Sequence, residues 1–253
     1  MFEREVVDGV AVLRMTHGPA NALDLELLQG IGDALEDIGA SNAKALVITG
    51  RDTVFSAGAE LFRVLEEGTE YLEIAGKAFD RAFEALFTFP RPVVAAINGH
   101  AVAGGCVIAQ ACDHRIAAAG GARIGLAELK VGVPFPTWAL EIVRYSVPPP
   151  HFAELILTGR LCNPDEARTA CLVDVVVPPD ELLDAAVAMA SRLARIPPAT
   201  FALTKRAMRA PTLERVERYG PVADAEGATV WASDDVRASI SAFLTRTFGT
   251  DTR

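Results

Sequence analysis

Positive charge is scarce in this sequence. Its 253 residues include 24 lysines and arginines against 33 aspartates and glutamates, which gives a formal net charge of −9 at pH 7. A protein that binds nucleic acid needs a basic face to meet the phosphates, so this balance of charge excludes that class of function. An acidic enzyme can still bind an anionic small molecule through a few local cations, so nucleotide-bearing substrates are not excluded.

Cysteine is scarce as well. The four cysteines, Cys106, Cys112, Cys162 and Cys171, show no spacing typical of a metal site. Without a secretory context, we interpret them as free and mostly buried thiols of a reducing compartment. The N-terminal stretch MFEREVVDGVAVLRM lacks the basic segment and following apolar run of a secretory signal. These absences predict a cytoplasmic protein without a metal site.

Long uninterrupted hydrophobic runs are also missing. The nearest approach, from Val93 to Cys112, has about the length that a membrane-spanning helix requires. Polar side chains at Asn98, His100 and Gln110 interrupt it, together with several glycines, and prolines precede it. We therefore interpret RPVVAAI, NGHAVAGG and CVIAQAC as a buried strand, a turn and a buried helix, and predict no membrane span.

Most of the chain alternates between strand and helix patterns. Hydrophobic residues make up 51% of the sequence, enough to bury one large domain, or one domain with an appendage. The patterns predict a hairpin around Asp8-Gly9, a helix capped by Asp24, a strand KALVITG, a long helix ended by Pro90 and a strand DHRIAA. This alternation favours an α/β fold.

The C-terminal part has a different pattern. Helical spacing dominates from Thr137 onward, and Asn163 with Glu166 resembles a capping box at the start of a helix. After Pro178-Pro179 the chain is predicted to be helical nearly to its end, with interruptions at IPP and AP. We predict a core over residues 1–195 and a helical region over residues 196–253.

Two glycine-bearing turns follow two strands of the predicted sheet. The segment FSAGAEL comes after KALVITG, and GHAVAGG comes after RPVVAAI. Each turn brings backbone N–H groups close to a helix start, where they can receive a developing negative charge. Neither segment fits a dinucleotide-binding fingerprint or a Walker loop, which excludes those phosphate sites. A single glycine turn usually only turns the chain, but a pair after successive strands indicates a site.

These segments resemble the signature segments of the enoyl-CoA hydratase/isomerase (crotonase) superfamily. The likeness continues, in the family's order, through PANALDLELL, INGHAVAGGCVIAQACDHRIAA, ARIGLAELKVGV, AELILTGRLCNPDEARTACLVDVVVP and SAFLTR. The resemblance implies a crotonase-like spiral of ββα units with a C-terminal helical region. It also implies an acyl-CoA thioester substrate, with CoA as part of the substrate and no separate cofactor, and assembly as a homotrimer or a dimer of trimers.

The resemblance also implies where a substrate lies. The backbone N–H groups of Ala59 and Gly104 are expected to form an oxyanion hole for a thioester enolate, where small residues allow close approach. Substrate contacts are implied for Ala20, Ala22, Leu23, Ala57, Gly58, Leu61, Gly105 and Val107. The nucleotide end of CoA is expected to meet Phe243 and Arg246, for which a core phenylalanine beside a solvated arginine is the alternative. Lys205 and Arg206 are a second choice for the phosphates.

The number of carboxylates bears on the reaction. Many hydratases of the superfamily carry a glutamate where this chain has Val107, and a second family glutamate falls on Glu128. A hydratase generally uses both carboxylates to place and activate water. One carboxylate, with a pKa raised by burial, suits removal of a proton at one carbon and its return at another. The resemblance therefore predicts a Δ3,Δ2-enoyl-CoA isomerase with Glu128 as its catalytic residue.

Alternatives stay open at this point. The protein could be a hydratase with an unrecognised second group, or an acyl-CoA-binding protein without turnover, because a fold does not guarantee chemistry. Glu128 could instead be a carboxylate that completes a helix cap. A structural role is preferred for Glu60, His100, Cys106, Asp113 and Arg115.

Overall fold

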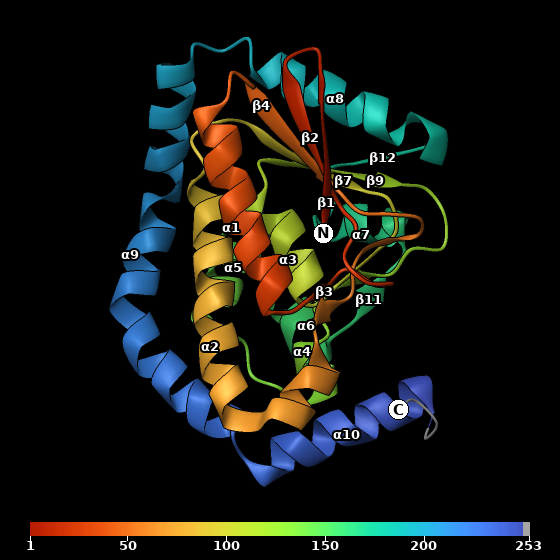
Figure 1. Ribbon diagram of the computed structural model, residues 1–253, viewed down its shortest axis with the longest axis vertical. Helices are drawn as coiled ribbons and strands as arrows, with labels where there is room; N and C mark the ends of the chain where they lie inside the picture. Colours follow the sequence, from red (N-terminus) through yellow and green to blue (C-terminus); the bar gives the residue numbers. More distant parts are fainter. Residues whose placement is uncertain (250–253) are drawn as a thin grey trace.

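Six strands form the larger sheet of the protein (Figure 1). A computed structural model describes residues 1–249. The strands, in their order across the sheet, are β1 (Phe2–Val7), β2 (Val10–Met15), β4 (Ala45–Thr49), β7 (Val93–Ile97), β9 (His114–Ala118) and β12 (Val175–Val177). β1 and β2 form the predicted antiparallel hairpin, and each later neighbour pairs in parallel. Every residue of β4 and β7 is buried, as parallel strands covered on both faces require.

Shorter strands form a second sheet beside the first. They are β11 (Leu161–Cys162), β10 (Ile124–Gly125), β8 (His100–Val102) and β5 (Val54–Ser56), in that order, while β3 (Ala22–Leu23) pairs with β6 (Gly58–Ala59). In the chain, β4, β7 and β9 are each followed by a strand of this second sheet and then by a helix. The expected α/β spiral of ββα units is therefore confirmed.

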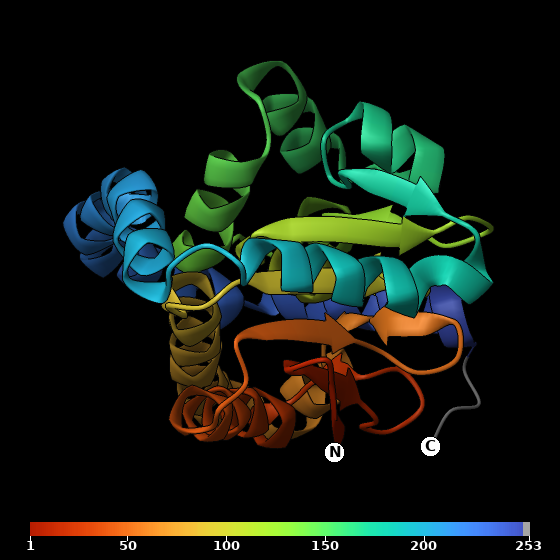
Figure 2. The same cartoon turned by 90° about the horizontal axis from the view of Figure 1, so that it is seen from above.

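Eight α-helices precede the C-terminal region and pack around the sheets and against one another. They are α1 (Leu25–Ala40), α2 (Leu61–Thr88), α3 (Gly104–Ala111), α4 (Glu128–Val131), α5 (Thr137–Ser146), α6 (Pro149–Thr158), α7 (Pro164–Thr169) and α8 (Leu182–Leu193), with a short 3-10 turn at Pro179–Glu181. α8 packs across β4, β7 and β9, and Figure 2 shows it lying along that face. α3 is buried between α2 and α5, so the apolar run after residue 93 is a strand, a turn and a core helix, as predicted.

The C-terminal region consists of two long helices. α9 (Pro198–Trp231) runs beside α5 and α2, and α10 (Asp234–Phe248) packs against α2 and α4 (Figure 1). The helical character predicted for this region is confirmed over the described residues, and residues 250–253 of the predicted range lie outside them. The capping box of Asn163 and Glu166 is present at the start of α7.

One predicted interruption of the last helices is wrong. Pro198 opens α9, as the IPP pattern indicated, but Pro211 of the AP pattern lies inside the continuous helix. Ion pairs hold α9 on either side of that proline. Arg209 bonds to Asp113, and Arg215 bonds to Glu141 of α5. These tertiary contacts override the local preference of proline to end a helix.

Candidate active site

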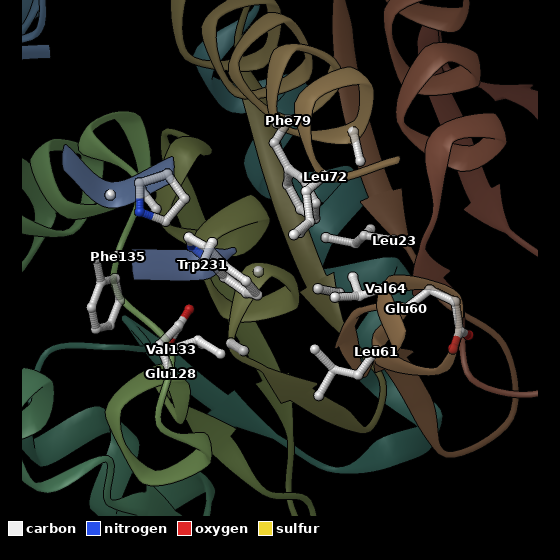
Figure 3. Close-up of a pocket in the computed structure, with 18 of the residues that line it drawn as sticks. Leu23, Glu60, Leu61, Val64, Leu72, Phe79, Glu128, Val133, Phe135 and Trp231 are labelled. Carbon is white, nitrogen blue, oxygen red and sulfur yellow. The ribbon is translucent and has the colours of Figure 1, made fainter. Parts of the chain in front are cut away.

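A cavity of about 590 Å³ lies where α2, α4, α9 and α10 approach one another. Residues from β6, from the start of α3 and from the loop after α4 complete its wall. The lining is mostly apolar, and Figure 3 shows Leu23, Leu61, Val64, Leu72 and Phe79 on one side of the cavity and Val133 and Phe135 on another. A concave, largely apolar cavity with few polar groups is the usual form of a small-molecule site.

Glu128 is a buried carboxylate on this wall. It is the first residue of α4, its exposed fraction is 8%, and its Oε2 atom has no hydrogen-bond partner. Burial raises the pKa of Glu128 to about 8, because an ionised carboxylate loses its hydration there. No side chain caps the N-terminus of α4, and a backbone hydrogen bond from Glu128 itself to its carboxylate lowers the pKa only in part. A carboxyl group with a pKa near neutrality suits a general base.

The two glycine turns meet at the cavity because glycine allows their backbones to touch. Gly58 has a φ of +86°, and a Cβ atom there would lie 2.8 Å from the carbonyl oxygen of Val102. A Cβ atom on Gly105 would lie 2.3 Å from the carbonyl oxygen of Ser56. Only residues without side chains can pack so closely, which explains the glycines in both motifs.

This packing places two backbone N–H groups at the cavity. The N–H of Glu60 donates to the carbonyl of Leu23 at 3.3 Å. Adjacent residues of a strand direct their N–H groups to opposite sides, so the N–H of Ala59 points away from β3. Gly104 is the first residue of α3, where N–H groups have no partner within the helix. Ala59 and Gly104 both line the cavity, as an oxyanion hole requires.

Ala103, just before α3, has an uncommon backbone conformation. Its φ is 51° and its ψ is −125°, a region that favours glycine. Such strain costs about 1 to 3 kcal/mol and persists where the surrounding structure enforces it. Here the conformation turns the chain from β8 into α3 and directs the first N–H groups of the helix toward the cavity.

The sequence-predicted substrate contacts divide into two groups. Leu23, Ala57, Leu61 and Phe243 line the cavity, as do Ala59, Gly104 and Glu128. The residues that do not line it are Ala20, Ala22, Gly58, Gly105, Val107 and Arg246. Gly58 and Gly105 instead allow the close packing of the two turns. Substrate contacts of Ala20 and Ala22 stay a prediction.

Two of these positions differ clearly from expectation. Val107 is fully buried in the main core and does not line the cavity, although it lies one turn after Gly104 in α3. Arg246 is exposed on α10, and its guanidinium carbon lies 5.9 Å from the centre of the Phe243 ring. A contact of Arg246 with CoA therefore stays a prediction.

The second choice for binding phosphates is wrong for Lys205. Its ammonium group is buried and donates to Asp113 Oδ2 at 2.7 Å and to the carbonyl of Arg91. Burial lowers the pKa of Lys205 to about 8, and Asp113 offsets only part of that effect. Arg206, the neighbouring residue, is exposed.

The structural roles preferred for nearby polar residues agree with the contacts. Glu60 accepts a hydrogen bond from the N–H of Phe62 at the start of α2, and its carboxylate points away from the cavity (Figure 3). The remaining contacts join His100 to the N–H of Arg123, Asp113 to the N–H of Val93, and Arg115 to Asp174. Cys106 is buried in the core, where burial raises the pKa of its thiol to about 12.

Sequence reasoning missed several residues of the cavity. Tyr71 and Asp80 of α2 and Asp224 and Trp231 of α9 line it. Burial, with the nearby carboxylates of Asp224 and Glu84, raises the pKa of Asp80 to about 6. The only local signal for Asp80 was its place beside the apolar face of a predicted helix. Acidic residues in that place are usually solvated, so the signal did not indicate a site.

Two kinds of feature are absent from the part of the chain that the structure describes. Among residues 1–249, no helix is both long and apolar enough to cross a membrane. Over the same residues, no group of three or more histidine, cysteine, aspartate and glutamate side chains is arranged to hold a metal ion.

Comparison with known proteins agrees with the fold and the motifs. The family described as enoyl-CoA hydratase/isomerase matches residues 5–248. A putative enoyl-CoA hydratase of Thermus thermophilus is 36% identical over 228 residues, which cover 88% of this chain and 89% of the relative. Mitochondrial enoyl-CoA delta isomerase 1 of Rattus norvegicus is 29% identical, over 96% of this chain and 86% of the relative.

A solved structure is similar over almost the full length. The crystal structure of human mitochondrial Δ3,Δ2-enoyl-CoA isomerase superposes with a TM-score of 0.94 and 27% sequence identity. The superposition covers 99% of this chain and 99% of that chain. The likeness therefore includes the helical region as well as the sheets.

Proposed function

The chain belongs to the enoyl-CoA hydratase/isomerase family, and we propose that it isomerises 3-enoyl-CoA to 2-enoyl-CoA in fatty-acid metabolism. The reaction moves a double bond along the acyl chain without adding or removing an atom. It needs a base that removes a proton from C2 of the thioester and returns it at C4, and it needs donors that hold the enolate in between.

Each requirement has a matching group in the cavity. Glu128 is the base, and its raised pKa of about 8 lets it both accept and return a proton near neutral pH. The N–H groups of Ala59 and Gly104 are the donors to the thioester oxygen. Apolar walls exclude water, which strengthens these hydrogen bonds and protects the enolate from protonation by solvent. CoA is part of the substrate, so no separate cofactor is needed.

The buried Oε2 atom of Glu128, which has no hydrogen-bond partner, is the observation that carries this proposal. A hydratase needs a second carboxylate beside the first to hold the attacking water. Val107 occupies the family's position for that group, and Glu60 points away as the cap of α2 (Figure 3). Other carboxylates line the cavity, but Glu128 is the only buried one among those that the structure describes there, and a proton shuttle needs only one.

Hydration is the second candidate function. The relative from Thermus thermophilus, at 36% identity, carries the name of a hydratase. A third possibility is a protein that binds acyl-CoA without turnover, since the oxyanion hole alone gives affinity for a thioester.

One assay separates the three functions. Purified protein is incubated with 3-enoyl-CoA and, separately, with 2-enoyl-CoA, and the products of isomerisation and of water addition are quantified. We expect isomerisation to dominate. Hydration of 2-enoyl-CoA at a comparable rate would replace the isomerase proposal with the hydratase. Tight binding of both thioesters without any product would favour the binding protein.

We also propose that the protein assembles as a homotrimer or a dimer of trimers in the cytoplasm. Large apolar side chains on α9 support assembly, because Leu203, Met208 and Val222 are each more than half exposed. Buried free cysteines support a reducing compartment. Sedimentation velocity of the purified protein tests the assembly, and a monomer at micromolar concentration would contradict it.

A further inference from the structure

Two aspartates lie together on the cavity wall at the contact between α2 and α9. Asp80 comes from α2 and Asp224 from α9, and both line the cavity that contains Glu128. Their carboxylates are close enough that Asp224 is one of the charges that raise the pKa of Asp80. Their position matters because the acyl chain has to occupy this cavity.

The two carboxylates differ in their bonds to the protein. Asp224 Oδ1 accepts a hydrogen bond of 2.9 Å from the N–H of Thr137, the first residue of α5. This bond ties the side chain of Asp224 to the start of α5. No hydrogen bond or ion pair among residues 1–249 involves the carboxylate of Asp80, and burial is the main cause of its raised pKa. Asp80 is therefore a half-buried acceptor without a protein donor.

Most residues that line this cavity are apolar, although the cation Lys77, three residues before Asp80 on α2, lines it as well. Phe79, Phe83, Phe135 and Ala139 line the same cavity, and Figure 3 shows Phe79 and Phe135 on different walls. A plain alkyl chain in this space would remove water from Asp80 and offer no hydrogen bond in return. Such a loss costs about 1 to 3 kcal/mol for a buried polar group.

One other polar side chain on the cavity wall lacks a partner within the protein. Glu128 has an exposed fraction of only 8%, it points into the cavity (Figure 3), and its Oε2 atom has no hydrogen-bond partner. Buried polar groups in native proteins nearly always have hydrogen bonds, so an unpartnered one on a cavity wall points to a bond made by a bound molecule.

We propose that Asp80 and Asp224 select acyl-CoA molecules whose chain carries a hydrogen-bond donor, a hydroxyl or an ammonium group, at the end remote from the thioester. A donor at that end forms a hydrogen bond to Asp80. This bond replaces the hydrogen bonds that the carboxylate makes to water before the ligand binds. A chain that ends in a carboxylate is repelled by the pair. The inference rests on the proposed function only in taking acyl-CoA as the ligand, and it requires no turnover.

Binding of saturated acyl-CoA molecules, measured by titration calorimetry, tests the selection without any reaction. A series of plain alkyl chains of increasing length first shows the length at which affinity stops rising, where the chain end reaches the pair. At that length, ligands with a methyl, hydroxyl, ammonium or carboxylate end are compared. We expect one donor-ended ligand to bind about tenfold more tightly than the methyl-ended one, and the carboxylate-ended ligand to bind most weakly. Tighter binding of the hydroxyl-ended or of the ammonium-ended ligand shows which of the two donor groups the site selects.

Variants at Asp80 test the assignment to this residue. Asp80→Leu should remove the preference for a donor and tighten binding of the plain alkyl chain. Asp80→Asn should keep a preference for hydroxyl and lose any preference for ammonium, and it guards against a folding defect of the leucine variant. Glu84→Gln is the matched control, because Glu84 is exposed on the same helix, raises the pKa of Asp80 and does not line the cavity. It should leave the preference unchanged.

Two results would overturn the inference. One is a methyl-ended ligand that binds as tightly as either donor-ended ligand in the unmodified protein. The other is a donor preference that persists in Asp80→Leu. Binding without preference for any chain end contradicts only this inference. Failure of every acyl-CoA to bind contradicts the proposed function as well.

Discussion

Two carboxylates, the partly buried Asp113 and the buried Glu128, have opposite environments. Asp113 receives hydrogen bonds from Lys205 at 2.7 Å, from Arg209 at 2.8 Å and from the backbone N–H of Val93 at 2.8 Å. Glu128 has an oxygen without any partner. A buried charge whose bonds are all satisfied within the protein holds the structure together, whereas an unsatisfied one keeps its bonding capacity for a ligand.

The comparison also separates their positions. Asp113 lies between α3 and β9 and ties α9 to the core through side chains ninety residues and more away in the sequence. Glu128 lies on a short helix at the cavity, where a proton can reach a bound molecule. Substitutions at the first should therefore change stability, and substitutions at the second should change chemistry.

The largest expected effect is on the rate of isomerisation in Glu128→Gln. Glutamine keeps the shape of the side chain but cannot accept the proton, so the rate should fall by about 100- to 10,000-fold. Affinity for a saturated acyl-CoA should stay within about tenfold, because the oxyanion donors are unchanged. Steady-state kinetics and calorimetry measure the two quantities. Activity within a few-fold of the unmodified protein would remove Glu128 from its role.

Asp113→Ala should show the reverse pattern. It leaves Lys205 and Arg209 buried without their anion, and breaking a buried ion pair costs about 3 to 5 kcal/mol of unfolding free energy. Urea unfolding measures that loss. At a temperature where the variant is still folded, its isomerisation rate should fall far less than that of Glu128→Gln. Equal losses of activity in the two variants would refute the division between structural and chemical carboxylates.

Gly104→Val tests the oxyanion hole instead of the carboxylates. A Cβ atom at this position would lie 2.8 Å from Leu23 Cδ1 and 3.4 Å from Phe79 Cε1, so the new side chain intrudes between two lining residues. We expect about a 100- to 1000-fold loss of rate together with weaker acyl-CoA binding. Gly32→Val on α1 is the control, because its Cβ would meet nothing within 4 Å. Normal binding and rate in Gly104→Val would refute the oxyanion assignment.

The fold and the places of Ala59, Gly104 and Glu128 on the cavity wall could be predicted because the signals are local. Strand, turn and helix follow one another in short motifs, and FSAGAEL and AVAGG each need glycine for the contact between the two turns. Asp80 and Asp224 could not be predicted, because their meeting depends on how α2 packs against α9. Pro211 was misinterpreted for the same reason, since distant ion pairs hold its helix.

Titration of Glu128 gives a smaller effect with a defined sign. Its pKa is raised from 4.5 to about 8 in the folded state, so the stability it contributes is complete below pH 4.5 and is lost as pH rises to about 8. Glutamine does not ionise, so Glu128→Gln does not lose stability over this pH range. The variant should therefore gain stability relative to the unmodified protein as pH rises through that window, by up to a few kcal/mol, about 1.4 for each pKa unit. A difference in stability that does not change between pH 5 and pH 9 would show that Glu128 is not buried as an unpaired acid.

The same titration fixes the pH profile of the reaction. A base acts only when ionised, so kcat/KM for isomerisation should rise with pH and level off above about 8. Asp113→Ala, assayed where it is folded, should keep this profile, because Asp113 takes no part in the proton transfer. A profile that is flat between pH 6 and pH 9 would mean that another group limits the rate.

The smallest expected effect is a gain of hydration in Val107→Glu. The unmodified protein should hydrate 2-enoyl-CoA poorly or not at all, because Val107 offers no hydrogen bond to water and is fully buried in the core. A glutamate introduced there has to extend from the core toward Glu128 before it can hold water. Burial and the nearby carboxylate would raise its pKa and keep it protonated, so hydration should stay at a trace level. The variant should also lose stability, because a polar group enters the core without a partner. Val107→Leu is the matched control, with no gain of hydration and little loss of stability. Hydration in Val107→Glu that approaches the isomerisation rate would show that this position faces the substrate, and that the second carboxylate alone separates the two reactions.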